Sequence, residues 1–102
     1  LKNDDIVKVF NDRGSCLAGI KISDDVMEGI VFLPVGAWYN PAVDDDTFCV
    51  HGNPNVLTDD IGCSSLSQGP SAHSTLVQIH KWEKDLPSIT IFNAPVLKKL
   101  KL

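Results

Sequence analysis

The stretch IVKVFNDRGSCLAGIKI, residues 6–22, sets the fold class because it has the pattern of a β-hairpin. Residues 6–10 are mostly β-branched or aromatic, which favours a strand. Residues 11–14 (NDRG) have the composition of a turn, in which Gly14 is expected to adopt a positive φ. Residues 15–22 return as a second strand. The sequence therefore predicts two antiparallel strands joined by a short turn.

Further short segments along the chain also have strand composition. Residues 30–33 (IVFL) predict a third strand, and residues 75–82 (TLVQIHKW) alternate apolar and polar side chains as a half-buried strand does. Residues 88–92 (SITIF) predict a last strand or an extended tail. A single helical turn is expected near residues 55–59. We therefore predict one mainly β domain over residues 1–102, a small barrel or sandwich with long polar loops and short helical turns.

Residues 51–69, HGNPNVLTDDIGCSSLSQG, form the longest polar segment. They combine Gly and Pro with Asn, Gln, Ser and Thr, and their only adjacent pair of long apolar residues is Val56-Leu57. This composition predicts a long loop, and long ordered loops in small domains are usually functional. Asn and Gln amides both donate and accept hydrogen bonds, which suits recognition of a polar heterocycle without charge.

Composition excludes several classes of protein. The formal net charge of -4 argues against a nucleic-acid-binding module, which would carry a basic stripe. No apolar run approaches the length that a membrane helix requires, so no membrane insertion is expected. Three cysteines cannot all pair within one chain, which disfavours a disulfide-stapled secreted fold. Because the chain starts without Met, we expect it to be part of a longer protein.

Two alternatives stay open for the sulfur and imidazole side chains. Cys49 and His51, with Cys63 and His73 downstream, are residue types that bind zinc, but the paired C-x-x-C spacing of structural zinc sites is absent. Cys63 with His73 as base is a conceivable nucleophilic pair. Buried cysteines and loop histidines are the favoured interpretation, so no metal ligand and no catalytic residue is predicted here.

Four motifs together resemble a known family. They are VKVFNDRG at residues 7–14, GIVFLPVGAWY at 29–39, GNPNVLT at 52–58 and LSQG at 66–69. The chain resembles the C-terminal cofactor-binding domain of bacterial molybdopterin oxidoreductases of the dimethyl sulfoxide reductase family. Within it, the trimethylamine-N-oxide and biotin sulfoxide reductase branch is the most similar. Cys63 departs from the pattern, because the family more often has Thr there.

The resemblance implies a double-psi β-barrel that covers one face of a molybdenum bis(molybdopterin guanine dinucleotide) cofactor. A pterin edge offers ring nitrogens, an amine and a carbonyl, and leaving such buried groups unpaired would be costly, so amide partners are expected. Asn55 and Gln68 are the first candidates for contacts to the pterin or its pyrophosphate, and Arg13 is a candidate for a phosphate or guanine. The remaining candidates are Asn53, Gly69, Ser71 and His73.

The resemblance also implies what surrounds the domain. The remaining domains of the same catalytic subunit would be its partners, one barrel strand would precede Leu1, and the isolated domain would be inactive. The whole protein would be a bacterial N- or S-oxide reductase of anaerobic respiration, periplasmic in preference to cytoplasmic. Its other domains would select among trimethylamine N-oxide, biotin sulfoxide, methionine sulfoxide and dimethyl sulfoxide. The alternative is a free-standing β-barrel interaction module without catalysis, docking through the Trp38-Tyr39 face.

Overall fold

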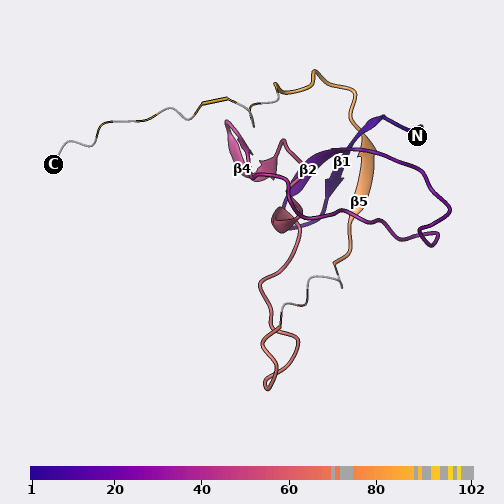
Figure 1. The fold of residues 1–102 in the computed structure, drawn as a ribbon, viewed down its shortest axis with the longest axis vertical. Coiled ribbons are helices and arrows are strands. Elements are labelled where there is room, and N and C mark those ends of the chain that lie inside the picture. Colours follow the sequence, from indigo (N-terminus) through magenta and orange to yellow (C-terminus); the bar gives the residue numbers. More distant parts are fainter. Residues whose placement is uncertain are drawn as a thin grey trace.

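In the part of the chain that the structure describes, the fold is an open β-sheet with one short helix (Figure 1). The computed structural model describes residues 1–69, 71, 75–88, 90, 93–94, 97 and 99. Five strands lie in the order β3-β4-β2-β1-β5. The elements are β1 (Ile6–Phe10), β2 (Ser15–Gly19), β3 (Pro41–Ala42), β4 (Asp45–Cys49), the 3₁₀ helix η1 (Pro54–Val56) and β5 (Gln78–Lys81).

The predicted hairpin is confirmed as β1 and β2. The strands are antiparallel, with Ile6 opposite Gly19 and Phe10 opposite Ser15. The second strand ends at Gly19 rather than at the predicted Ile22. Ile20 still pairs with the segment before β1, since its N–H donates to the Asp5 carbonyl and its carbonyl accepts from Asp4 N–H, both at 2.9 Å. Asp4 adopts a positive φ of 71°, which interrupts the extended backbone there.

Gly14 has a different role from the one that the sequence predicts. It is absent from the glycines with positive φ, which are Gly29, Gly36 and Gly52. Instead, a Cβ at Gly14 would lie 2.5 Å from the carbonyl oxygen of Thr47 and 2.6 Å from that of Val56. The hairpin turn therefore packs against the backbone of β4 and η1, and only a residue without a side chain fits there.

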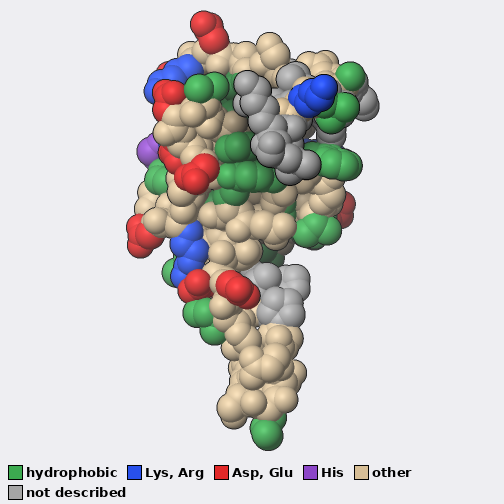
Figure 2. Space-filling model, turned by 90° about the vertical axis from the view of Figure 1, so that its left-hand side faces the viewer, with side chains coloured by type: hydrophobic (Ala, Val, Ile, Leu, Met, Phe, Trp, Pro, Cys, Tyr) green, Lys and Arg blue, Asp and Glu red, His purple; other side chains and the backbone are tan. Residues whose placement is uncertain are grey.

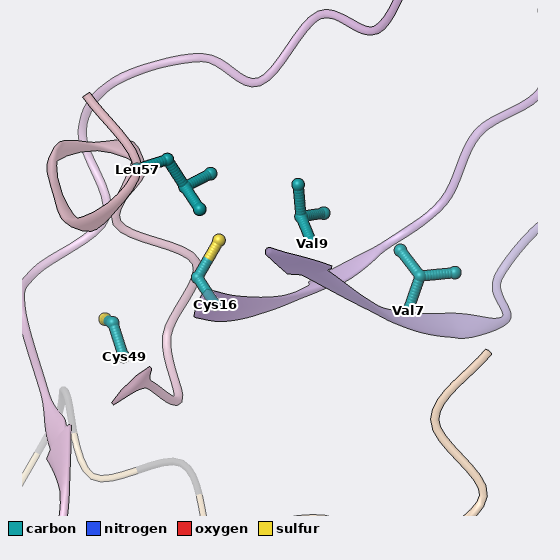
Figure 3. Close-up of a cluster of buried hydrophobic side chains, with 5 residues drawn as sticks. All are labelled: Val7, Val9, Cys16, Cys49 and Leu57. Atoms are coloured by element: carbon teal, nitrogen blue, oxygen red, sulfur yellow. The ribbon is translucent and has the colours of Figure 1, made fainter. Parts of the chain in front are cut away.

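A small core lies on one face of this sheet (Figure 3). Val7 and Val9 from β1, Cys16 from β2, Cys49 from β4 and Leu57 after η1 are all buried. Cys16 and Cys49 are partners across the parallel pair of β2 and β4, and both are free thiols. Leu57 extends from the end of η1 toward Cys16 and Val9, so the helical turn caps the sheet.

The structure differs from three predictions about secondary structure. Residues 30–33 form no strand, because their backbone finds no partner strand among the described residues. The predicted strand 75–82 is shortened to β5, although Val77 and Ile79 are half-buried between exposed Gln78 and His80 as the alternation predicts. The helical turn expected near 55–59 occurs slightly earlier, as η1. The strand expected at 88–92 falls partly outside the described residues.

The sheet does not close into a barrel within the described part of the chain. β3 and β5 form its two edges, and the double-psi barrel is therefore not confirmed. The radius of gyration is 16.0 Å, compared with about 13 Å for a compact domain of this length. Figure 1 shows two long loops that extend away from the sheet. None of the described helices is long and apolar enough to cross a membrane.

Candidate cofactor-binding site

The turn between β1 and β2 is organised by Asn11. Its Oδ1 accepts hydrogen bonds from the backbone N–H of Arg13 at 2.9 Å and of Gly14 at 3.3 Å. Its Nδ2 donates to the carbonyl oxygens of Leu57 at 2.8 Å and Leu76 at 3.1 Å. One amide thus ties the hairpin turn to the end of η1 and to the approach to β5. Sequence reasoning missed Asn11, although Asn at the first position of a turn is a common signal.

Arg13 projects from this turn and pairs with Asp59. Its Nη2 lies 2.5 Å from Asp59 Oδ2, and both side chains are 45% exposed. An ion pair at this exposure contributes little to stability and can exchange partners. The guanidinium has five N–H donors, so the pair leaves Arg13 able to contact a further acceptor.

Beside this pair is a cleft of about 480 Å³. It holds carboxylates, a guanidinium, amides and hydroxyls together with an apolar wall. The lining residues are Phe10, Asn11, Asp12, Arg13, Asp59, Ile61, Ser71, Thr75, Leu76, Val77 and Gln78. Two of the predicted site residues, Arg13 and Ser71, therefore meet in one cleft.

The asparagines of GNPNVLT have different surroundings on η1. Asn53 caps the helix: its Oδ1 accepts from the backbone N–H of Asn55 at 2.9 Å, and its Nδ2 donates to the Ala37 carbonyl at 3.0 Å. Both ends of the Asn53 amide are thus used to hold the fold. Asn55 is exposed, and no hydrogen bond to its side chain occurs within the described residues. Of the two, Asn55 is the amide available to a ligand.

The polar loop that follows is held by its own hydrogen bonds. The backbone N–H of Cys63 donates to the Gly69 carbonyl at 2.8 Å, and that of Ser64 donates to the Ser67 carbonyl at 3.0 Å. Gln68 Nε2 donates to the carbonyls of Ser64 at 3.0 Å and Ser65 at 3.3 Å. Figure 2 shows the result, a narrow protrusion with few hydrophobic side chains below the body of the molecule.

This arrangement separates the predicted site residues into three groups. Arg13 and Ser71 line the cleft, with the backbone N–H of Ser71 donating to the Ile61 carbonyl at 3.1 Å at the base of the loop. Asn53 is the N-cap of η1 and Asn55 lies within it, next to the hairpin turn. Gln68 and Gly69 lie in the protruding loop, where the Gln68 amide is engaged internally. His73 lies outside the described residues.

The described residues leave the cysteine and histidine alternatives untested, because both include His73, which lies outside them. In the part of the chain that the structure describes, no three His, Cys, Asp or Glu side chains gather closely enough to hold a metal ion. His51 Nε2 lies 3.2 Å from Asn40 Nδ2, while its buried Nδ1 has no hydrogen-bond partner there. Burial and the neighbouring Cys49 raise the pKa of the Cys16 thiol to about 11, which makes it a poor nucleophile.

Comparisons with known proteins agree on one family. The model of the family described as "Molydopterin dinucleotide binding domain" matches residues 1–76. A trimethylamine-N-oxide reductase of Salmonella typhimurium is 49% identical over 98 residues, which are 94% of this chain and 12% of that protein. Trimethylamine-N-oxide reductase 1 of Escherichia coli O157:H7 is 46% identical over 98 residues, again 94% of this chain and 12% of that protein.

A more distant relative has the same extent of match. The trimethylamine-N-oxide reductase of Vibrio cholerae is 40% identical over 97 residues, 94% of this chain and 12% of that protein. The chain thus spans about 12% of the length of these curated relatives. The matched residues include the hairpin turn, η1 and the polar loop. By this match the chain belongs to the molybdopterin dinucleotide-binding domain family.

Proposed function

We propose that residues 1–102 form the cofactor-binding domain of a larger molybdenum-dependent reductase of N- or S-oxides. The observation that carries this proposal is the family match over residues 1–76, together with reductase relatives that align with 94% of the chain. Trimethylamine N-oxide is the first candidate substrate because the relatives are named for it. Biotin sulfoxide is the second. When bound, the molybdenum cofactor would supply the oxygen-atom transfer chemistry.

The cofactor that we propose is molybdenum bis(molybdopterin guanine dinucleotide). Pterin and guanine share an edge with an amine, a ring N–H and a carbonyl. The carboxylates of Asp12 and Asp59 are acceptors for such N–H groups, and Arg13 is a donor to the carbonyl. The cleft of about 480 Å³ lies within the range of ligand pockets, roughly 300–1,000 Å³. These residues fit one bicyclic ring of the cofactor, and the rest would contact other domains.

Charge also limits how a phosphate can bind at this cleft. Asp12 and Asp59 would repel a pyrophosphate, and Arg13 already faces Asp59. We therefore assign the heterocycle to the cleft and the phosphates to the neutral donors on η1, of which Asn55 is the most accessible. Asn53, Gln68, Gly69 and Ser71 would position the backbone around these contacts, and His73 remains a proposed contributor from the sequence.

The double-psi barrel is the architecture that we propose for the domain within the whole protein. A parallel pair, β2 and β4, lies in an otherwise antiparallel sheet and is joined by a long crossover. This parallel pair and its crossover support the proposal of a double-psi barrel. The strands that would close the barrel would come partly from sequence preceding residue 1.

Location and role are proposed from the relatives. All three compared reductases are bacterial. We propose a periplasmic enzyme of anaerobic respiration, with a cytoplasmic one as the alternative. Fractionation of cells that express the full-length protein would test this, and recovery of the folded enzyme only from the cytoplasm would contradict the periplasmic assignment.

The cofactor role is tested in the full-length protein by substituting the amides. Asn55→Ala and Gln68→Ala are compared with Asn3→Ala, an exposed asparagine at the opposite end of the hairpin whose Oδ1 accepts from Ile22 N–H. Molybdenum and pterin per polypeptide are measured for each. We expect a several-fold loss for Asn55→Ala, a smaller loss for Gln68→Ala and none for Asn3→Ala.

Two results would contradict the proposal at different levels. Equal cofactor content in all variants would remove Asn55 and Gln68 from the site without affecting the family assignment. Wild-type full-length protein that contains neither molybdenum nor pterin would contradict the function itself. Circular dichroism of each variant checks that the fold is retained.

A further inference from the structure

The segment between β2 and β3 exposes many large apolar side chains. We name residues 22–39 the apolar loop. Nine of its large hydrophobic side chains are exposed: Ile22, Val26, Met27, Ile30, Val31, Phe32, Val35, Trp38 and Tyr39. Phe32 is 78% exposed and Val35 81%. Soluble proteins rarely leave large contiguous apolar patches uncovered, and such patches mark interaction sites.

Part of the backbone of this loop also lacks hydrogen-bond partners among the described residues. Among the described residues, no hydrogen bond involves the backbone of residues 31–36, while Ile30 N–H donates to the Met27 carbonyl at 3.1 Å. The loop is held at both ends, where Ile22 N–H donates to Asn3 Oδ1 at 2.6 Å and the Ala37 carbonyl accepts from Asn53 Nδ2 at 3.0 Å. Between these ends, Leu33 is partly buried against the core. Backbone groups of native proteins are nearly always paired or solvated, and the described part of the chain supplies no partner for these groups.

The sequence of the same residues favours a strand. Residues 30–33 (IVFL) are β-branched and aromatic, and glycines with positive φ precede and follow them at Gly29 and Gly36. A strand-forming sequence with free backbone groups is suited to pairing with the edge of another sheet. Figure 1 shows the outer part of the loop extending away from the sheet before the chain returns toward it.

The acidic residues at one end of the loop indicate the charge that a partner surface needs. Asp24, Asp25 and Glu28 are exposed, and no ion pair involves them within the described residues. A complementary surface therefore needs an apolar centre and basic side chains at one end. The chain aligns with about 12% of the length of the relatives, so in a protein of similar length most of the polypeptide that could supply this surface would lie outside these residues.

We propose that the apolar loop docks on the rest of the full-length polypeptide, where residues 30–33 add as a β-strand to an open sheet edge flanked by apolar and basic residues. This inference rests on the proposed function only in placing the chain within a longer protein. A cleft of about 340 Å³ lined by Ala37, Trp38, Val50, His51 and Leu86 among others continues the same surface. This cleft would receive an apolar side chain from the part of the polypeptide on which the loop docks.

Amide hydrogen exchange in the full-length protein tests strand formation. We expect the amides of residues 30–33 to exchange at least tenfold more slowly than in a peptide of the same sequence, because pairing protects them. Exchange at the rate of the free peptide would overturn the proposal. Phe32→Asp should restore fast exchange there, whereas Val43→Asp, which changes a fully exposed valine outside the loop, should not.

Cross-linking identifies the partner and separates this inference from the proposed function. A photoreactive p-benzoylphenylalanine in place of Val35 should cross-link to the same polypeptide outside residues 1–102. A cross-link within residues 1–102, a cross-link to another protein, or none at all would overturn the proposal. Molybdenum and pterin are measured on the same preparation, so a cofactor-free protein with the expected cross-link contradicts the function but supports the docking.

Discussion

The hairpin region and the apolar loop are similar in composition but opposite in environment. Val7, Val9 and Leu57 are buried in the small core on β1 and β2. Phe32, Val35 and Trp38 are just as apolar but exposed. The difference is that β1 has partner strands on both sides, β2 and β5, whereas the loop has none within the described residues. A strand-forming sequence therefore becomes a strand only where an edge is available.

The largest effect on stability in this comparison is expected from truncating a buried side chain in the core. Leu57→Ala removes a side chain that is 3% exposed and should destabilise the hairpin region by about 2–5 kcal/mol through lost burial and a cavity. The measurement is the opening free energy of β1 and β2 amides from hydrogen exchange in the full-length protein. Leu66→Ala is the matched control, since Leu66 is 98% exposed and should cost less than about 0.5 kcal/mol.

The next largest effect is expected for a substitution in the hairpin turn. Gly14→Ala would place a Cβ 2.5 Å and 2.6 Å from two backbone carbonyl oxygens, which cannot move aside as a flexible side chain can. We expect a loss of about 1–3 kcal/mol, by the same measurement. Gly19→Ala is the control, because its Cβ would meet nothing nearer than Ile6 Cδ1 at 4.0 Å. Equal stability of the two variants would contradict the close packing of the turn.

Local signals in the sequence were enough for the hairpin but not for its boundaries or surroundings. The strands 6–10 and 15–19 and the short helix depend on near neighbours, and the predictions for them are confirmed in type. The strand predicted at 30–33 depends on a partner that no local pattern reveals. The order of the sheet, with β2 parallel to β4, also depends on contacts between distant residues.

The candidate site shows the same limit. Arg13 and Ser71 were predicted from the family resemblance, and they line one cleft. Asn11 was missed because its bonds reach residues 46 and 65 positions away in the sequence. Gln68 was predicted as a ligand contact, and it also bonds its own loop. Residue type indicates a capacity for hydrogen bonding, but only the fold shows which partners use it.

The smallest effect concerns two thiols in different environments, Cys16 in the core and Cys63 in the exposed polar loop. Cys16 is fully buried between β1 and β4, and burial, with Cys49 as a second cause, raises its pKa from 9.0 to about 11. The folded state thus keeps its proton where the unfolded state has lost it. Its contribution to stability is fully present below pH 9 and decreases as the pH rises from 9 to 11.

Comparing variants isolates this contribution from other groups that titrate in alkali. Cys16→Ala should make the opening free energy of β1 and β2 less dependent on pH between 9 and 11 than in the wild type, whereas Cys63→Ala, in the exposed loop, should leave that dependence unchanged. At pH 8 an alkylating reagent should modify Cys63 well before Cys16, because thiolate character and access both favour it. Equal alkylation rates for the two thiols would mean that the core around Cys16 opens as readily as the polar loop.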